Sequence, residues 1–220
     1  MRCLLCSVET HSLPTFHQLF TLEASAKTLC EDCSLRFKKI AEHHCPMCYK
    51  QGEHDICSDC IYWQKQGKVV NHQALYCYNS GMKEYFSNYK FQGDYLLRKV
   101  FQNDLKLALK SYRDYTLVPI PLSEQREAER GFNQVIGLLD GLGVPYQELL
   151  TKREVKKQSD KSRLERLQSQ NPFELRIDKV LPDKILLIDD IYTTGMTLQL
   201  AAQLFYEKEV KEIKTFSLAR

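Results

Sequence analysis

The sequence predicts an α/β protein, a mainly parallel sheet flanked by helices, preceded by a small cysteine-rich zinc-ribbon module. Three observations lead to this prediction. Four C-x-x-C pairs lie within the first 60 residues, and from residue 75 onward apolar strands alternate with helical patterns. An apolar run then ends in two acids, which are followed by a loop of small residues and a helix.

The composition is that of an ordinary globular protein. Hydrophobic residues make up 43% and charged residues 27% of 220 residues, which argues against intrinsic disorder. The first residues lack the apolar segment of an export signal, and no stretch has the length and apolarity of a membrane span. We therefore expect a cytoplasmic protein of two units without membrane insertion.

The paired cysteines indicate metal binding rather than disulfides. Of nine cysteines, eight fall into the four C-x-x-C pairs, and each pair places two thiolates on one tight turn where they can converge on a tetrahedral ion. Eight thiolates supply two structural zinc sites. The expected ligands are Cys3, Cys6, Cys30, Cys33, Cys45, Cys48, Cys57 and Cys60.

The spacing leaves the pairing of these ligands open between consecutive and crossed ribbons. We favour consecutive ribbons, because the eight residues between Cys48 and Cys57 form a loop that closes at small entropic cost. Redox-active dithiols are disfavoured, since no βαβ context surrounds the pairs, and an iron–sulfur cluster is an alternative that the spacing permits. About 60 residues with little apolar periodicity cannot bury a sufficient core, so metal should stabilise a module of residues 1–65.

A second domain is expected over residues 75–220, and its first elements follow from apolar patterning. Residues 73–78 are typical of a strand that holds the unpaired Cys77 as a buried, inert thiol. Residues 95–109 carry helical periodicity, and residues 115–121 are typical of a buried strand that ends in prolines. A helix over residues 135–142 should end just before Gly143.

The segment from 184 to 197 is the most informative. It consists of an apolar strand, then Asp189 and Asp190, then a T-T-G-x-T loop that opens a helix. The apolar residues of this helix fall on one face, and they are Leu198, Ala201, Ala202 and Phe205. Residues 212–218 return as a strand, which gives βαβ units and a parallel sheet.

This strand, loop and helix suit a phosphorylated sugar. Backbone N–H groups at a helix N-terminus bind phosphate, and Gly195 permits close approach. Asp189 and Asp190 would repel phosphate but can accept hydrogen bonds from vicinal ribose hydroxyls. A solvated loop with one acid as a helix cap is the alternative, and the apolar run before the pair disfavours it.

The motif resembles the binding signature for 5-phosphoribosyl 1-pyrophosphate (PRPP) in type I phosphoribosyltransferases. The whole chain is similar to the ComF family of competence proteins (ComFC and GntX-like), in which a double zinc ribbon precedes a phosphoribosyltransferase domain. Shared segments are residues 90–94, 118–121 and 130–134, and Gln158 followed by Arg166. One departure is Ser169, where the family usually has asparagine.

The resemblance implies a phosphoribosyltransferase-like sheet and a PRPP site, with Mg2+ accompanying the ligand. Arg130, whose forked donors suit pyrophosphate, joins the expected ligand-binding residues, while Arg126 fits this role and a solvated helix face equally well. The expected site comprises Asp189, Asp190, Thr193, Thr194, Gly195, Met196, Thr197 and Arg130.

Positive charge is concentrated in residues 152–166. Seven basic and three acidic residues give this segment a net charge of +4, which leaves −1 for the rest of a chain whose total is +3. It is interpreted either as a track for single-stranded DNA or as a solvated lid over the ligand. The expected contacts to nucleic acid are Lys152, Arg153, Lys156, Lys157, Lys161, Arg163 and Arg166.

Two functions follow from these patterns and from the resemblance. The first is a late competence protein of natural transformation, which binds single-stranded DNA and a helicase or translocase of the DNA-uptake machinery. The second is an active phosphoribosyltransferase that transfers ribose 5-phosphate to a nucleobase-like acceptor and releases pyrophosphate, although no acceptor site is identified. Five aromatic residues could stack on bases, although packing in the core is the alternative for each of them: Tyr85, Tyr89, Phe91, Phe132 and Tyr192.

Overall fold

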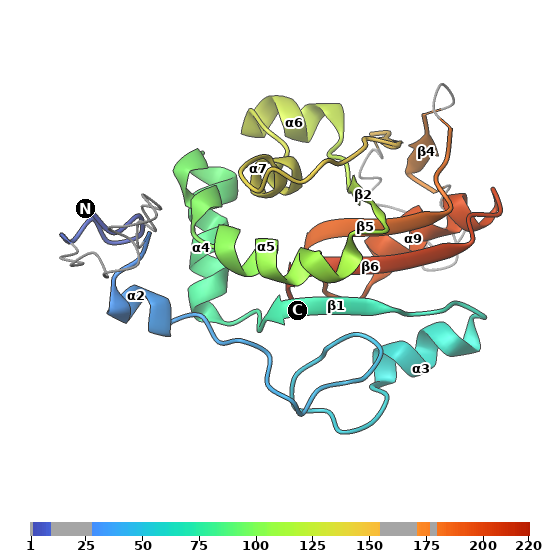
Figure 1. Cartoon of the computed structure of the whole chain (residues 1–220), viewed down its shortest axis with the longest axis horizontal. Helices are drawn as coiled ribbons and strands as arrows, with labels where there is room; N and C mark the ends of the chain where they lie inside the picture. Colours follow the sequence, from blue (N-terminus) through green and yellow to red (C-terminus); the bar gives the residue numbers. More distant parts are fainter. Residues whose placement is uncertain (1, 10–27, 155–170, 177–179) are drawn as a thin grey trace, which may run out of the picture.

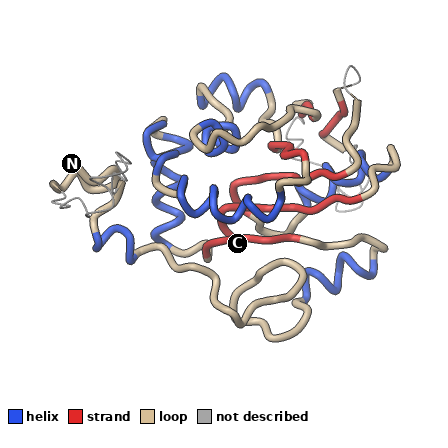
Figure 2. The backbone as a smooth tube through the Cα atoms, viewed as in Figure 1, coloured by secondary structure: helices blue, strands red, loops and turns tan. Residues whose placement is uncertain are grey.

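The main sheet has four parallel strands in the order β1-β6-β5-β2. The computed structural model describes residues 2–9, 28–154, 171–176 and 180–220 (Figure 1). The strands are β1 (His72–Tyr76), β2 (Thr116–Pro119), β5 (Lys184–Ile191) and β6 (Glu212–Ala219). Figure 2 shows them side by side with helices around them. A separate antiparallel pair is formed by β3 (Leu150–Lys152) and β4 (Phe173–Leu175).

The central strand β5 is apolar on both faces, because helices or other segments cover each side of the sheet. Ile185 and Leu187 pack into one apolar cluster, while Leu186 and Ile188 pack into another. This separation follows from the two-residue period of a strand. The sheet is therefore the middle layer of the molecule.

The helices of the first cluster are α3 (Ser58–Lys65) and α9 (Met196–Tyr206). The second cluster includes residues of α4 (Ser80–Phe91), the 3-10 helix η1 (Tyr95–Lys99), α5 (Gln102–Leu109), the 3-10 helix η2 (Lys110–Tyr112) and α7 (Gln134–Asp140). The remaining described helices are α2 (Glu31–Leu35) and α6 (Glu124–Arg130). None of the helices in the described ranges has the length and apolarity needed to cross a membrane.

The predicted fold class, a parallel sheet with flanking helices after a cysteine-rich module, is confirmed. The predicted apolar face of α9 is also confirmed, since its four predicted residues are all buried. Two predictions were wrong in detail. The helix expected to reach residue 142 ends at Asp140, and Cys77 lies just beyond β1 and is half-buried rather than buried.

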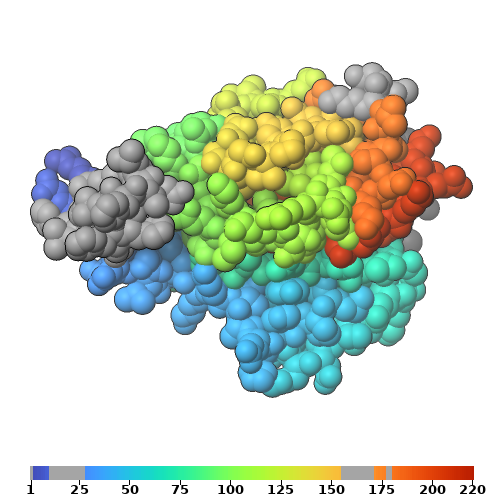
Figure 3. Space-filling model, in the orientation of Figure 1, coloured from blue at the N-terminus to red at the C-terminus, as the bar shows by residue number. Residues whose placement is uncertain are grey.

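The cysteine-rich segments lie against the α/β domain rather than apart from it. Figure 3 shows residues 28–65 along one side of the molecule, in contact with the segments that carry the sheet. Cys45 and Cys60 belong to the same apolar cluster as Val118 and Ile185 of the sheet. The N-terminal residues Leu4 and Leu5 pack against the other cluster.

Candidate functional site

Asp189 and Asp190 lie near the end of β5, at the carboxyl edge of the parallel sheet. Their exposed fractions are only 9% and 5%. Asp189 Oδ1 accepts a hydrogen bond of 2.9 Å from the Asp190 backbone N–H. Asp190 Oδ1 accepts a 3.3 Å bond from Gln134 Nε2, and Asp190 Oδ2 forms an ion pair with Lys90. The acid pair is thus held by residues from two helices.

Lys90 is the cationic partner of this pair, a role that no sequence pattern predicts. It lies in the last turn of α4, and its side chain is 14% exposed. Burial lowers the pKa of Lys90 to about 8, and the negative charge of Asp189 opposes this shift. Burial raises the pKa of Asp189 to about 6, against the effects of Lys90 and Lys152. Both groups are therefore mainly charged at neutral pH.

Arg130 lies at the end of α6, where Gly131 with a φ of +79° terminates the helix. Its guanidinium donates to Gln134 Oε1, so a chain of contacts runs from Arg130 through Gln134 to Asp190. Burial lowers the pKa of Arg130, and the charge of Arg126 adds to this effect. Arg130 is thus connected to the acid pair through Gln134.

The loop after β5 presents its hydroxyl residues to solvent. Thr193 and Thr194 are exposed, Met196 is 44% exposed, and Thr197 is half-buried in the first turn of α9. Gly195 caps α9 with a φ of +84°. A Cβ atom at Gly195 would overlap the Tyr192 side chain beneath it, so close packing and backbone conformation both require glycine.

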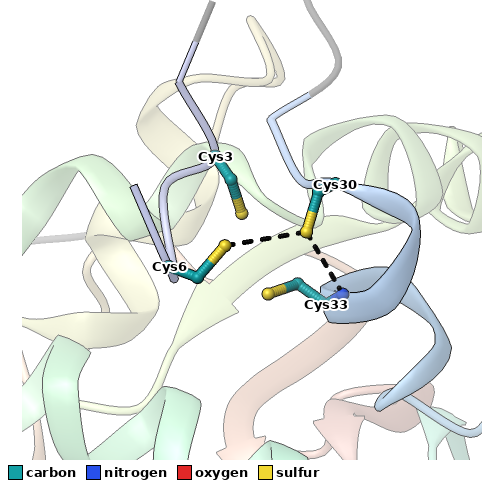
Figure 4. A group of neighbouring side chains, drawn as sticks. All are labelled: Cys3, Cys6, Cys30 and Cys33. Atoms are coloured by element: carbon teal, nitrogen blue, oxygen red, sulfur yellow. Dashed lines mark hydrogen bonds between the residues drawn. The ribbon is translucent and has the colours of Figure 1, made fainter. Parts of the chain in front are cut away.

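The eight paired cysteines form two groups of four, and each group could hold a metal ion. In each group of four, the sulfur atoms lie within 4.8 Å of one another. Figure 4 shows the four side chains of the first cluster converging from the N-terminal segment and from the start of α2, and its members are Cys3, Cys6, Cys30 and Cys33. The second cluster comprises Cys45, Cys48, Cys57 and Cys60. The favoured consecutive pairing is thus confirmed.

The sulfur separations agree with zinc ligation. Four sulfurs bonded to one zinc at about 2.3 Å lie about 3.8 Å apart. The separations are 3.7 Å for Cys6 and Cys30, 3.8 Å for Cys45 and Cys60, and 3.5 Å for Cys48 and Cys57. These distances are too long for disulfides, whose sulfurs lie about 2.05 Å apart. The donor set fits two structural metal ions.

The residues predicted to contact DNA are divided by the structure. Lys152 is half-buried at the end of β3, with its Nζ atom 5.1 Å from the centre of the Phe173 ring, and its charge acts on Asp189. Arg153 is exposed and forms an ion pair with Glu174. The other five lie outside the described residues, and they are Lys156, Lys157, Lys161, Arg163 and Arg166.

Of the aromatic residues considered for stacking, Tyr85, Tyr89 and Tyr192 are buried, and Phe132 is half-buried. Phe91 is 78% exposed, and its ring lies 5.7 Å from the guanidinium carbon of Arg130. Core packing therefore explains three of the five, whereas Phe91 offers an open ring face beside the site.

Three further residues surround the loop or the acids, although no sequence pattern predicts a role for them. Gln134 and Lys90 lie in segments shared with the resembling family, 130–134 and 90–94. Trp63 donates from its indole Nε1 to the Thr194 carbonyl at 2.8 Å. It is the single tryptophan of the chain, and this is the one sequence signal that could have drawn attention to it.

Comparison with known proteins gives three similar sequences of competence proteins. Competence protein ComFC of Streptococcus pneumoniae is 47% identical over 220 residues and is covered completely, as is this chain. Competence protein ComFC of Bacillus subtilis is 38% identical over 227 residues, which cover 99% of this chain and 94% of that protein. Competence protein F of Haemophilus influenzae is 25% identical, with 90% and 93% covered.

No protein-family model matches the chain. Among solved structures, a hypoxanthine phosphoribosyltransferase from Staphylococcus aureus is 16% identical with a TM-score of 0.34, covering 56% of this chain and 65% of that chain.

Proposed function

Because the chain belongs to the ComFC family of competence proteins, we propose that it acts in natural transformation as a cytoplasmic protein that binds single-stranded DNA and PRPP. The observation that carries the PRPP site is the position of the buried acids Asp189 and Asp190 directly before the loop that opens α9. Sugar hydroxyls and a phosphate need these two kinds of partner at neighbouring positions.

The groups around the acids support a ligand with a second, anionic end. Four basic side chains interact electrostatically with Asp189 or with one another, and they are Lys90, Arg126, Arg130 and Lys152. Such a cationic rim suits pyrophosphate, since arginine offers paired donors to phosphate oxygens. The ribose would then lie on the acids, between the 5′-phosphate on the loop and the pyrophosphate on this rim.

Mg2+ fits this site by the chemistry of its donors. Magnesium prefers carboxylate, phosphate and water oxygens. Asp190 Oδ2 is buried and makes no hydrogen bond within the described part of the chain, with only the ion pair to Lys90. When PRPP is bound, Mg2+ would neutralise pyrophosphate charge, and Asp189 and Asp190 would orient the ribose.

Support for DNA binding comes from charge and from one exposed aromatic side chain. Residues 152–166 carry a net +4, and Phe91 presents an open ring face beside Arg130. Basic groups track a phosphate backbone, while aromatic faces stack on bases without strict sequence preference. The cysteine-rich module, a frequent docking element, would engage the DNA-uptake machinery, such as a helicase or translocase.

Isothermal titration calorimetry with PRPP and Mg2+ tests the ligand site. Replacing both acids, Asp189→Asn with Asp190→Asn, should weaken binding by about 1–3 kcal/mol per lost charged hydrogen bond. Gln125→Ala on exposed α6 serves as the control, because within the described residues the Gln125 side chain bonds to Glu129 alone. Unchanged affinity of the double variant would remove the acids from the site.

Fluorescence anisotropy with labelled oligonucleotides at several salt concentrations tests DNA binding. Affinity should fall with salt at a log–log slope of about −0.7 per phosphate contacted. Lys156→Ala/Lys157→Ala/Lys161→Ala should flatten this slope, whereas Lys110→Ala on η2 should leave it unchanged. Equal slopes for parent and triple variant would exclude these lysines and direct attention to the cysteine-rich module.

The enzymatic alternative is not favoured. The similar full-length proteins are named for competence, and no acceptor site is apparent in the described ranges. An assay of pyrophosphate release from PRPP with a panel of nucleobases should therefore give no turnover above background. Turnover that requires both acids would reverse this conclusion.

A further inference from the structure

The loop proposed to bind phosphate is connected to the second cysteine cluster through two side chains, Trp63 and Arg220. Trp63 lies in α3, three residues after the cluster member Cys60, and is 4% exposed. Its indole Nε1 donates a 2.8 Å hydrogen bond to the Thr194 carbonyl, across 131 residues of sequence. A helix that begins at the cluster thus reaches the loop backbone.

Arg220, directly after β6, makes a second connection. One of its guanidinium nitrogens donates to the Thr193 carbonyl. The other lies 3.4 Å from Cys48 Sγ and donates to Asp59 Oδ2 at 3.0 Å. The guanidinium carbon lies 4.7 Å from the centre of the Tyr192 ring, and the Arg220 side chain is 9% exposed. One cation therefore contacts a cluster sulfur, an acid between two cluster cysteines, and the loop.

These contacts determine which way the loop backbone faces. A trans peptide unit directs its C=O and the following N–H to opposite sides. Because the carbonyls of Thr193 and Thr194 are held toward the cysteine-rich module, the N–H groups of Thr194 and Gly195 face away from it. Those N–H groups are the ones that a phosphate at the start of α9 would use.

The first cluster has no comparable connection in the described residues. Its neighbour Arg36 pairs with Glu84 of α4, and the Arg36 carbonyl accepts from Asn79 Nδ2 at 2.8 Å. These contacts anchor α2 to α4, away from the loop. The two clusters therefore have different neighbours, although their ligand sets are alike.

We propose that Trp63 and Arg220 are positioning residues of the phosphate loop, through which metal at the second cluster is coupled to ligand affinity. The first cluster is outside this coupling. The inference rests on the proposed PRPP site. Coupling of this kind is reciprocal, so bound PRPP must also raise the affinity of the second cluster for its metal.

Calorimetry on the zinc-loaded chain, with PRPP and Mg2+ as the probe, tests the positioning residues. Trp63→Phe keeps the apolar ring but removes the N–H donor, and Arg220→Met keeps an apolar stem but removes the guanidinium. Each should weaken binding about 5- to 10-fold, the ratio that corresponds to one lost hydrogen bond. The matched control Arg36→Met, which removes a cation beside the first cluster, should bind like the parent.

Metal release distinguishes positioning from a merely structural role. Zinc transfer from the parent chain to a chromogenic chelator is followed with and without saturating PRPP. PRPP should slow the release of one of two zinc ions about 5-fold or more in the parent, and this protection should shrink in Trp63→Phe and Arg220→Met. Cys6→Ser, which removes the first site, should retain the PRPP-sensitive ion.

The outcomes separate the two proposals. A parent chain that binds no PRPP contradicts the proposed function, and the coupling falls with it. Normal PRPP binding with unchanged affinity in both variants, or with no protection of either zinc ion, overturns the coupling alone.

Discussion

At the scale of single residues, Asp189 and Asp190 are neighbours with different electrostatic surroundings. Asp190 has Lys90 as an ion-pair partner and Gln134 as a donor, whereas Asp189 accepts a single hydrogen bond from the described residues, from a local backbone N–H. Burial accordingly raises the pKa of Asp189 to about 6 from 3.8. The two carboxylates should therefore affect stability in opposite directions.

Asp189→Asn should stabilise the fold at pH 7, because the native state then no longer holds a poorly compensated buried charge. The gain should be about 1 kcal/mol or more, which raises the thermal midpoint by about 2–4 °C. A folded-state pKa above the unfolded value means that stability is lost as pH rises through about 6, so the gain should vanish below about pH 4. Differential scanning calorimetry at several pH values measures it.

Asp190→Asn should instead destabilise the fold by about 1–3 kcal/mol, because it removes the ion-pair partner of a largely buried lysine. The double change Lys90→Met/Asp190→Asn removes both charges and should recover part of the loss. A destabilisation by Asp189→Asn as large as that by Asp190→Asn would refute the assigned difference.

The pKa of Asp189 also predicts how PRPP affinity depends on pH. Ribose hydroxyls donate to an ionised carboxylate, so affinity should fall as pH drops through about 6, by up to tenfold per pH unit. The ligand phosphates also titrate at about pH 6. The pH profile of the affinity of Asp189→Asn therefore measures the pH dependence that comes from the ligand. Identical parent and variant profiles in calorimetry would show that Asp189 does not titrate in the site.

At the scale of elements, the turn from β5 into α9 depends on Gly195. Gly195→Ala combines a left-handed backbone, at about 1–2 kcal/mol, with overlap between the new methyl group and Tyr192. Gly143→Ala is the matched control, because its φ is +65° and nothing lies within 4 Å of the added Cβ. We expect Gly195→Ala to lose more stability than the control in urea denaturation, and to lose PRPP binding as well. Equal losses would mean that Tyr192 moves aside freely.

The two cysteine clusters predict two zinc ions per chain. Elemental analysis of protein purified without added metal should give this ratio, and Cys6→Ser should reduce it to one, since Cys6 is the exposed ligand of the first cluster. The free thiol Cys77, which belongs to neither cluster, provides the control Cys77→Ser, for which the ratio should stay at two. Iron in place of zinc, or a ratio of one for the parent, would contradict the assignment.

At the scale of the whole molecule, the cysteine-rich module and the α/β domain share a core. The sequence alone predicts that chelation unfolds only the first 60 or so residues. Because Cys45 and Cys60 pack in one apolar cluster with Val118 and Ile185, chelation should also lower the unfolding temperature of the sheet. Circular dichroism thermal scans with and without chelator measure this effect. An unchanged transition of the α/β domain would show that the shared core contributes little.

The features that could be predicted from the sequence depend on residues close together in the chain. The C-x-x-C pairs, the strand that leads into Asp189 and Asp190, and the apolar face of α9 are of this kind. Each follows from local geometry: a tight turn for the cysteine pairs, a two-residue period for the strand and a helical period for α9. The resemblance to the ComF family rested on the same local motifs.

The meeting of distant segments at the site depends instead on how the whole chain packs. Trp63 and Thr194 are 131 residues apart, and Arg220 and Cys48 are 172 apart, so no local period links them. Their contacts follow from the order β1-β6-β5-β2, which places residues after β6 beside the loop after β5. Lys90 reaches Asp190 for a similar reason, because α4 packs over the face of the sheet where β5 ends. Sheet order is a property of the whole core, and this is why these partners could not be predicted from spacing.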